Sequence, residues 1–394
     1  MIVVGLSGSI SGLVQWLISA VSTVCNAFRT GRNTNVGNPL ASQMLDSQVE
    51  TLSKQFKYFS EKVYPGSSPL YQGLSARLAE DHEILSLASE SRKGEIVPNL
   101  FFAAVHFLLL QGTEHPLSAF FPSVSRSSSG AGGDPYPYFR SFCLENKNRI
   151  RYLASSKRVQ TNEVQRCACL LPAFALVARE SRGGPLSLVD IGASAGLNLQ
   201  WDRYGYDYGT GRKYGNVNSP VQISCTVRGD PKPPIPEIFP PVESRLGIDL
   251  NPIEVGDTEE MLWLRSLVWP EHTKRAELLQ RAIELARQDP PRVISGDVLD
   301  VLPGVLSELP RHSTICVYHS HTVYQFPQEL RDRLLSQITE LSRKRDLFEV
   351  SFEWWRGKDQ PSLELSRVHD GKRREELLAY CSPHGEWLQW VQRT

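Results

Sequence analysis

Short apolar segments alternate with helix-like segments through the second half of the chain, and this alternation constrains the fold more than any other feature. The strand-like segments cover residues 186–191, 244–250, 292–295, 314–319 and 347–352. Helical patterns occupy residues 259–288, 298–309 and 329–343. Strands that alternate with helices of this length form mainly parallel sheets covered on both faces. We therefore predict an α/β, Rossmann-like core in residues 158–394, with an insertion at about 202–241 that is rich in Tyr, Gly and Pro.

The N-terminal part of the chain has a different character. Residues 49–157 place apolar side chains at helical spacing and carry little strand signal. The apolar run at 99–110 is about a dozen residues long, which suits a buried core helix better than a membrane span of about 20 residues. We predict a helical cap domain over the carboxyl edge of the sheet, preceded by an extension and linker in residues 1–48.

The amino-acid composition narrows the classes of protein to which this chain could belong. Lys plus Arg and Asp plus Glu both number 43, so no global positive field draws the chain to nucleic acid. The 7 cysteines are odd in number and include no CxxC pair, which disfavours a disulfide framework or a zinc site. Residues 1–28 are uncharged but diluted by Gly and Ser, so a targeting or anchor role stays open without being favoured. We expect a cytoplasmic protein.

A turn with two glycines follows the first predicted strand, in the segment from Asp190 to Asn198 (DIGASAGLN). Glycine lets backbone approach a ligand, and open α/β sheets bind ligands outside the carboxyl ends of their strands. The turn lacks the GxGxxG spacing of dinucleotide sites. It is similar to the acid and glycine pattern of S-adenosylmethionine (SAM)-dependent methyltransferases, with a serine at the middle glycine. The predicted cofactor-binding residues here are Asp190, Gly192, Ser194, Gly196 and Asn198, unless the segment is an ordinary tight turn.

Two further acids end predicted strands. Asp249, after the second strand, stands where a ribose diol is bound in dinucleotide and SAM folds. Its distance along the chain from the glycine turn is far longer than usual, which is why residues 202–241 are assigned to an insertion. Asp297, after the third strand, is a candidate for the adenine amino group. Each acid would equally serve as a cap of the turn or helix that follows.

Three chemically versatile side chains cluster where the fourth strand ends. His319 and His321 are two residues apart and would share one face of an extended strand, and Tyr324 follows them. Methyltransferases place substrate-facing groups at this position, so we predict that all three residues contact the acceptor. At least one histidine would act as general base or orienting donor. No third ligand is evident beside the histidines, so we expect no metal.

The same glycine turn also matches the GxSxG nucleophile elbow of serine hydrolases, with Ser194 as the nucleophile. Asp297 and either His319 or His384 would complete the triad in the usual chain order. No earlier strands and no HGGG-type oxyanion loop precede the turn, however. Asp190 and Asp249 also have no role in that scheme.

Several segments together resemble a known family. They lie at residues 68–81, 158–172, 190–209, 244–252, 264–271 and 296–303. These segments resemble the family called domain of unknown function 2332, over residues 49–390. The resemblance implies a fold related to SAM methyltransferases but brings neither an activity nor a catalytic residue.

The favoured function is methyl transfer from SAM to a small or medium-sized acceptor molecule. A serine hydrolase and a non-catalytic SAM- or nucleotide-binding protein remain as alternatives. Arg158 and Arg166, in the polar segment before the first strand, are candidates for holding a carboxylate.

Overall fold

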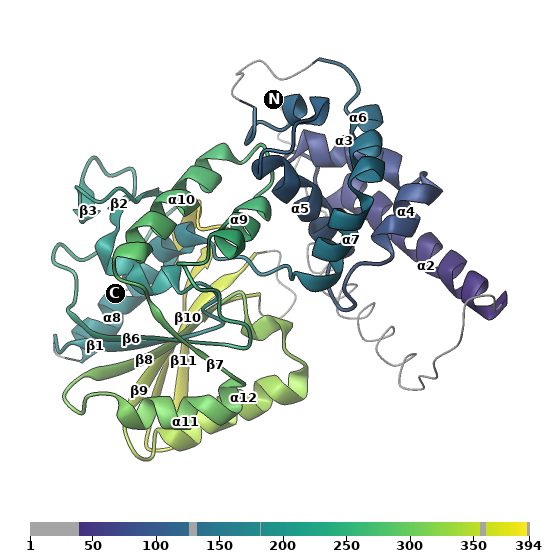
Figure 1. Cartoon of the computed structure of the whole chain (residues 1–394). Coiled ribbons are helices and arrows are strands. Elements are labelled where there is room, and N and C mark those ends of the chain that lie inside the picture. The colour runs from purple at the N-terminus through teal and green to yellow at the C-terminus, as the bar shows by residue number, and fades with distance from the viewer. Residues whose placement is uncertain (1–38, 126–131, 182, 355–359, 392–394) are drawn as a thin grey trace. The chain divides into compact units, whose positions relative to one another are not determined.

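The computed structural model describes residues 39–125, 132–181, 183–354 and 360–391, with side chains from residue 46 onward. The predictions for residues 1–28, and for the linker as far as residue 38, lie outside the described residues. The linker prediction for residues 39–48 is wrong, because these residues are helical. The chain divides into two compact units, which are described separately (Figure 1). A helical unit extends to Thr161 and also includes Leu262–Glu277, and a sheet unit comprises Asn162–Met261 and the residues from Leu278 on. The placement of the helical unit over the sheet edge therefore stays a prediction.

The helical unit consists of helices packed around one apolar core. Its elements are α2 (Pro39–Tyr58), the π-helix η1 (Phe59–Val63), α3 (Pro69–Leu78), α4 (His82–Ala88), α5 (Val97–Leu110), η2 (Pro116–Phe120), α6 (Tyr136–Glu145) and α7 (Lys147–Ser156). The apolar run predicted as a core helix forms α5, whose residues from Leu100 to Leu109 are all buried. A helix that is apolar on every face is stable only when other elements surround it. Side-chain caps start α3 and α4, as at Asp81, which accepts hydrogen bonds from two backbone N–H groups of α4.

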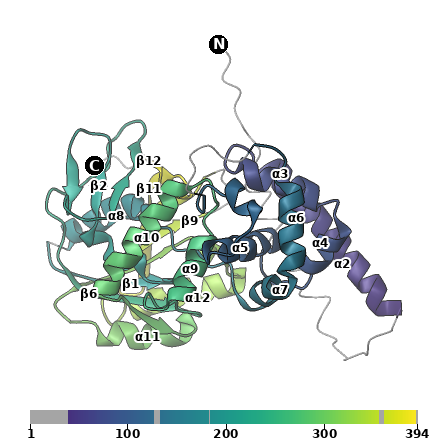
Figure 2. The same cartoon turned by 45° about the horizontal axis from the view of Figure 1, so that its top comes forward.

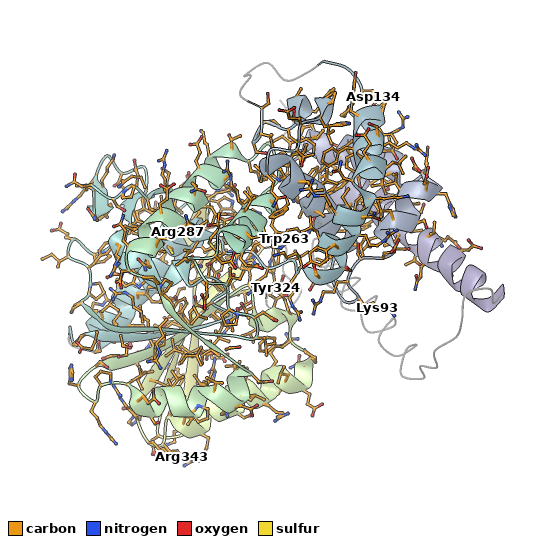
Figure 3. The ribbon with its side chains drawn as sticks, in the orientation of Figure 1. Lys93, Asp134, Trp263, Arg287, Tyr324 and Arg343 are labelled. Carbon is orange, nitrogen blue, oxygen red and sulfur yellow. The ribbon has the colours of Figure 1, made fainter. Side chains whose placement is uncertain are left out.

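A distant segment completes this helical core. Trp263, labelled in Figure 3, is buried in it and donates a hydrogen bond from Nε1 to the Arg158 carbonyl at 2.8 Å. The Glu271 carboxylate accepts from the Ser68 hydroxyl and the Leu70 N–H, both at 2.8 Å. The single helix predicted over 259–288 is wrong: α9 (Thr258–Ser266) and α10 (Thr273–Gln288) are separate. Pro270 lies between them, and proline disfavours helical backbone at the residue before it.

The sheet unit is built on a nine-stranded sheet. Its order is β5-β12-β11-β10-β9-β8-β1-β6-β7. The parallel strands are β1 (Leu186–Ile191), β6 (Val242–Asp249), β7 (Arg292–Ser295), β8 (Thr314–Ser320) and β9 (Leu347–Glu353). The antiparallel extension contains β10 (Ser362–His369), β11 (Lys372–Cys381) and β12 (Trp387–Trp390), and the short β5 (Thr226–Val227) pairs with β12. This large, mostly parallel sheet confirms the predicted mixed α/β class.

Helices cover both faces of the parallel strands (Figures 1 and 2). On one face, α11 (Val298–Glu308) and α12 (Gln328–Leu341) bury Leu302, Leu334 and Ile338 against the apolar strand residues. On the other lies α8 (Cys167–Glu180). A 3-10 turn, η3 (Val164–Arg166), comes directly before this helix. Within the described residues, no helix has the length and apolar character needed to cross a bilayer.

The predicted insertion contains a small sheet of its own. Its strands are β2 (Gly205–Asp207), β3 (Lys213–Gly215) and β4 (Gln222–Ser224), with β2 and β3 forming an antiparallel hairpin. Three alternate tyrosines are buried and donate to backbone carbonyls: Tyr204 to Leu197, Tyr206 to Trp201 and Tyr208 to Ala168. These aromatic residues therefore anchor the insertion to the sheet unit.

The strand order determines where a ligand site can form. The chain passes from β1 to β6 and β7 on one side, then returns to β8 and β9 on the other side of β1. In open α/β sheets, ligands bind outside the carboxyl ends of the strands at such a switch point in strand order. The predicted glycine turn and the predicted histidines both lie at this switch point.

Candidate functional site

The turn after β1 has an unusual backbone. Gly192, Ser194 and Gly196 all have positive φ, at 80°, 55° and 71°. Few residues other than glycine adopt this conformation, so Ser194 is held there by its surroundings. Asp249, at the end of β6, accepts the Ser194 N–H at Oδ2 and the Asn251 N–H at Oδ1, both at 2.8 Å. Asp249 therefore fixes the turn and its own loop, and its capping role is observed.

The two glycines are required by close packing inside the protein. A Cβ atom on Gly192 would lie 2.3 Å from the side chain of Thr322, in the loop after β8. A Cβ atom on Gly196 would lie 2.8 Å from Pro291, next to the start of β7. Contacts this short are incompatible with any side chain. We predicted these glycines for the close approach of a ligand. This stays a prediction, because packing within the protein already accounts for both glycines.

Asp190 is a buried acid at the end of β1, where its residue is only 3% exposed. Burial raises the pKa of Asp190 to about 7, and the nearby Asp249 also raises it, while Tyr318, His319 and Arg166 partly offset this rise. The Tyr318 phenol is close enough to act on the pKa, but its hydroxyl does not reach hydrogen-bond geometry. A buried carboxyl group at the end of a strand is suited to a ligand that donates a hydrogen bond to it.

His319 lies in the interior of the sheet. Its Nδ1 is 2.7 Å from Oε1 of Glu353 and its Nε2 is 3.1 Å from Oε1 of Glu349, and the three side chains are fully buried. Burial alone would lower the pKa of His319, but the hydrogen bonds and charges of the two glutamates raise it to about 9. Arg373 forms an ion pair with Glu349. Because both ring nitrogens of His319 are engaged, we do not retain it as an acceptor-contacting residue.

Glu353 also shapes the loop that follows β8. Its Oε1 accepts the N–H groups of Thr322 at 3.0 Å and Val323 at 3.1 Å, and its Oε2 accepts the Tyr324 N–H at 3.3 Å. One buried carboxylate on β9 thus holds both the sheet histidine and three consecutive backbone groups of this loop. The loop carries Thr322 against the glycine turn.

His321 is the second predicted histidine, and it lies just beyond the strand. Strand β8 ends at Ser320 and His321 has a φ of 57°, so the argument from a shared strand face does not apply to it. Its ring makes edge contacts with Tyr324, Phe352 and Trp354, with centroids 5.9, 5.1 and 6.2 Å away. Tyr324 lies in the same loop (Figure 3), and burial raises the pKa of its phenol to about 12.

Buried polar atoms without a hydrogen-bond partner gather at this switch point. Among the described residues they include Ser194 Oγ, Tyr318 OH and His321 Nε2. Tyr318 is paired with Asp190 in the sheet register, and Ile191 is paired with His319, so the ends of β1 and β8 lie side by side. Buried polar groups in folded proteins nearly always have partners. This cluster therefore fits a polar ligand.

The remaining predicted residues have local roles. Asn198 is buried, and its Oδ1 lies 3.5 Å from the Cys167 thiol. Asp297 is exposed and caps α11 by accepting the Leu299 N–H at 2.9 Å, as the alternative interpretation anticipated. In the described part of the chain, no three His, Cys, Asp or Glu side chains are arranged to hold a metal ion.

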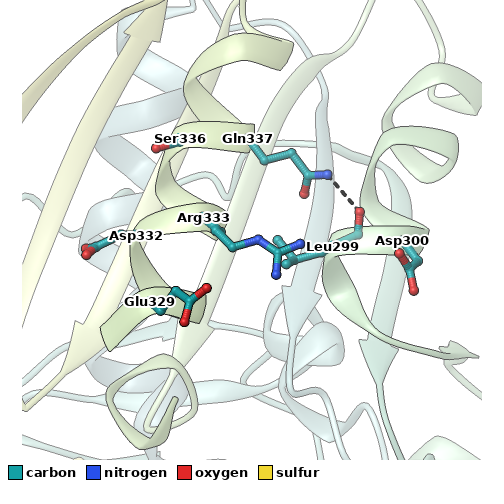
Figure 4. A pocket seen from close by; sticks show the side chains of 7 residues that line it. All are labelled: Leu299, Asp300, Glu329, Asp332, Arg333, Ser336 and Gln337. Carbon is teal, nitrogen blue, oxygen red and sulfur yellow. Dashed lines mark hydrogen bonds between the residues drawn. The ribbon is translucent and has the colours of Figure 1, made fainter. Parts of the chain in front are cut away.

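A surface pocket lies elsewhere, between α11 and α12 (Figure 4). Gln337 crosses it and donates from Nε2 to the Leu299 carbonyl at 2.7 Å. Its lining residues are Leu299, Asp300, Glu329, Asp332, Arg333, Ser336 and Gln337. None of the predicted site residues is among them, so the pocket does not contribute to the candidate site.

Two residues near the candidate site were predicted only in alternative roles: His384 as a triad histidine and Arg166 as a carboxylate partner. The turn before β12 brings His384 to it, with Nδ1 3.5 Å from Oε2 of the buried Glu163. Arg166, predicted only as a possible carboxylate partner, is buried and donates from Nε to the Pro383 carbonyl at 3.0 Å. Its Nη1 donates to the Ser320 carbonyl at 3.3 Å, directly before His321. The run of polar residues before β1 is the only sequence signal for this group.

Comparison with known proteins defines the family. The model of domain of unknown function 2332, described as an uncharacterized protein conserved in bacteria, matches residues 53–390. The chain belongs to this family. The resemblance seen in the sequence segments is thereby confirmed, and domain of unknown function 2332 covers parts of both compact units. A search of curated proteins finds no match.

Proposed function

We propose that the sheet unit binds SAM at the β1/β8 switch point and transfers its methyl group to a small or medium-sized acceptor. The observation that carries this proposal is Asp190, a nearly fully buried carboxyl group whose pKa burial raises to about 7. The methionyl ammonium group of SAM would supply a hydrogen-bond donor and a positive charge next to this carboxyl group. A pKa of about 7 would then fall, because a nearby cation favours the ionised carboxylate.

Other residues would hold the rest of the cofactor. Asp249 has two oxygens that each accept one backbone N–H, which leaves lone pairs for a ribose diol. Asp297 would offer its second oxygen to the adenine amino group, and Ser194 and Asn198 would line the turn. Thr322 limits the approach at Gly192, so the ligand must contact this side chain. Bound SAM supplies an electrophilic methyl group, and the protein contributes mainly by aligning the acceptor with it.

The test is calorimetric titration of the purified chain with SAM, S-adenosylhomocysteine, NAD and ATP. We expect binding of the first two, and a loss of about 10- to 100-fold in affinity for Asp190→Asn, as for a charged hydrogen bond of about 1.5–3 kcal/mol. Asp300→Asn, at an exposed acid of the α11 surface, is the matched control and should bind normally. The proposal fails if the unaltered chain binds neither SAM nor its demethylated product, or if Asp190→Asn binds both as tightly as the unaltered chain.

Serine hydrolysis is the second candidate, and one observation favours it. Ser194 has a φ of 55° and a buried Oγ without a partner, as expected for a serine at a strained nucleophile elbow. Its triad partners are unsuitable, however. His319 is bound between two glutamates, and Asp297 caps a helix at the surface. The nearby His321 accepts a hydrogen bond at Nδ1, whereas a triad histidine donates from that atom to its acid.

A fluorophosphonate probe separates the two candidates. On the methyltransferase proposal, Ser194 is a turn residue and the chain stays unlabelled after prolonged incubation. Stoichiometric labelling that disappears in Ser194→Ala would instead establish an activated serine and replace the proposal.

A further inference from the structure

The geometry around His321 fixes which of its ring nitrogens carries a proton. The indole Nε1 of Trp354 donates a hydrogen bond to Nδ1 of His321 at 3.2 Å. An indole nitrogen can only donate, so Nδ1 must be the unprotonated nitrogen of the ring. The proton of the neutral imidazole is therefore on Nε2, and this atom is buried with no partner among the described residues. His321 thus presents one unused N–H donor.

The ring is also held in place. Tyr324, Phe352 and Trp354 surround it with edge contacts, and the Gln325 side chain donates to the His321 carbonyl at 2.6 Å. The backbone N–H of His321 donates to the Phe352 carbonyl at 3.0 Å. A donor that is both oriented and desolvated gives up little entropy or solvation when it meets an acceptor.

Two basic side chains, Arg166 and His384, lie close to this donor. Burial lowers the pKa of His321 well below its usual value, and the nearby Arg166 and His384 lower it further. The imidazole is therefore neutral at neutral pH, and the field at Nε2 favours a negatively charged partner. Arg166 is attached to the same strand end through its hydrogen bonds to Ser320. Acids lie nearby as well: Arg166 lowers the pKa of Asp190, and Oε2 of Glu163 is 3.5 Å from Nδ1 of His384.

We propose that the Nε2–H of His321, beside Arg166, binds an anionic oxygen of the methyl-accepting substrate, either a carboxylate or a phosphate group. The inference deepens the proposed function, because it names the chemical class of the acceptor. It also narrows the earlier expectation of a general base or an orienting donor: His321 acts as an orienting donor and not as a general base. Removal of a proton from the acceptor belongs to another group.

The experiment follows the His321 ring directly, by ¹H–¹⁵N correlation spectra of the full chain labelled at its 9 histidines. His321→Phe identifies the Nε2–H signal by its loss, and Trp354→Phe should release the ring into a mixture of tautomers. Inorganic phosphate and acetate are then titrated separately at constant ionic strength set with chloride. We expect a saturable shift of the Nε2–H signal with at least one of the two anions. A shift with phosphate alone indicates a phosphate-bearing acceptor, and a shift with acetate alone indicates a carboxylate.

Two variants provide the affinity test. His321→Phe keeps a planar ring but has no donor, and should weaken the anion by at least about 10-fold. His321→Gln keeps an amide N–H donor, and should stay within about 3-fold of the unaltered chain. Absence of any shift with both anions, an Nδ1–H tautomer, or equal binding by all three proteins overturns the proposal.

Binding of S-adenosylhomocysteine distinguishes a failure of the acceptor proposal from a failure of the proposed function. If His321→Phe binds this product normally while losing the anion, the donor serves the acceptor. If His321→Phe loses the product itself, the donor serves the cofactor and the acceptor proposal is overturned. If the unaltered chain binds the anion but neither SAM nor its product, the function proposed above fails while the anion site remains.

Discussion

At the residue scale, Asp190 and His319 are buried ionisable groups on neighbouring strands. The protein disfavours the charged form of Asp190 and stabilises the charged form of His319. The ring of His319 is enclosed by two carboxylates, and its charged form is stabilised. Burial raises the pKa of the Asp190 carboxyl group, so its charged form is disfavoured. Fully paired buried charges maintain a structure, whereas a buried acid held near neutrality at the end of a strand is typical of a functional position.

The first prediction follows from Asp190. Because burial raises its pKa from 3.8 to about 7, this group costs stability progressively as the pH rises through that window. Asp190→Asn should therefore be more stable than the unaltered chain at pH 8, by up to about 4 kcal/mol, and similar to it near pH 4. Urea unfolding at both pH values measures this difference, with Asp297→Asn as a control at an exposed acid. A variant that is equally or less stable at pH 8 would contradict the expected cost of the buried carboxylate.

The second prediction concerns His319, whose raised pKa favours its charged form, whereas the raised pKa of Asp190 favours the neutral form. A pKa raised to about 9 contributes stability that is complete below about pH 6.5 and is lost as the pH rises through 9. His319→Asn should reduce the free energy of unfolding by about 3–5 kcal/mol at pH 6, because two buried glutamates lose their partner. On the order of 3 kcal/mol of this deficit should disappear by pH 10.

Denaturant titrations at low salt measure the His319 effect. His312→Asn, at an exposed histidine 3.6 Å from Glu243, serves as the control and should change little. A deficit that stays constant between pH 6 and pH 10 would show that His319 is not charged in the folded protein.

At the element scale, local pattern predicted the parallel strands well and the later strands poorly. The bounds of β1 and β7 coincide with the prediction, because short apolar runs between turn residues are local signals. Strands β10 to β12 were not predicted. Strand β11 (KRREELLAYC) is rich in charged residues that favour helices, and only pairing with β10 and β12 makes it extended.

The candidate site likewise combines residues that a local sequence pattern indicates with residues that only the fold brings together. The acid and glycine turn is contiguous in the sequence and could be recognised there. Glu353 and Trp354 contact the loop after β8 from about 30 residues away, and nothing near them in the sequence indicates these contacts. Pairings of this kind depend on the sheet register, which the sequence pattern does not specify.

The third prediction tests the contact between the glycine turn and the loop after β8. Gly192→Ala combines a positive φ with a Cβ atom only 2.3 Å from Thr322, whereas Gly211→Ala has the same φ of 80° with nothing within 4 Å. Both variants carry a backbone strain of about 1–3 kcal/mol. Gly192→Ala should destabilise the protein more than Gly211→Ala, by about another 1–3 kcal/mol for overpacking.

A double variant checks the cause of this difference. Adding Thr322→Gly to Gly192→Ala removes the clashing side chain and should recover most of the excess loss measured in urea. Equal destabilisation by the two alanine variants, or no recovery in the double variant, would show that the turn and the loop are not packed together.

At the scale of the whole molecule, the helical unit is discontinuous in the sequence. Residues 262–277 lie about 100 positions beyond its other residues, yet Trp263 and Leu267 belong to its apolar core. The sequence prediction placed this segment in the α/β core, because an amphipathic helix gives no indication of which unit it completes. The segment also supplies Glu271, which binds the start of α3.

The fourth prediction uses this connectivity. A fragment of residues 46–161 should be poorly folded, because it lacks a buried tryptophan whose loss alone costs about 3–5 kcal/mol. The same fragment joined by a Gly/Ser linker to residues 262–277 should regain helical circular dichroism and a cooperative thermal transition. A shorter fragment that melts as cooperatively as the joined one would show that residues 262–277 are dispensable to the helical unit.

The indole of Trp354, which donates to His321, determines how a substitution could change the chemistry of this site. Whether an imidazole gives or takes a proton at Nε2 depends on what its other nitrogen meets, and here that partner is a donor, Trp354. A carboxylate at position 354 would accept from Nδ1 and leave Nε2 as a base. The direction in which Nε2 of His321 hydrogen-bonds therefore depends on a residue 33 positions further along the chain. One substitution there would exchange the proposed anion-binding N–H for a basic nitrogen, without altering the histidine itself.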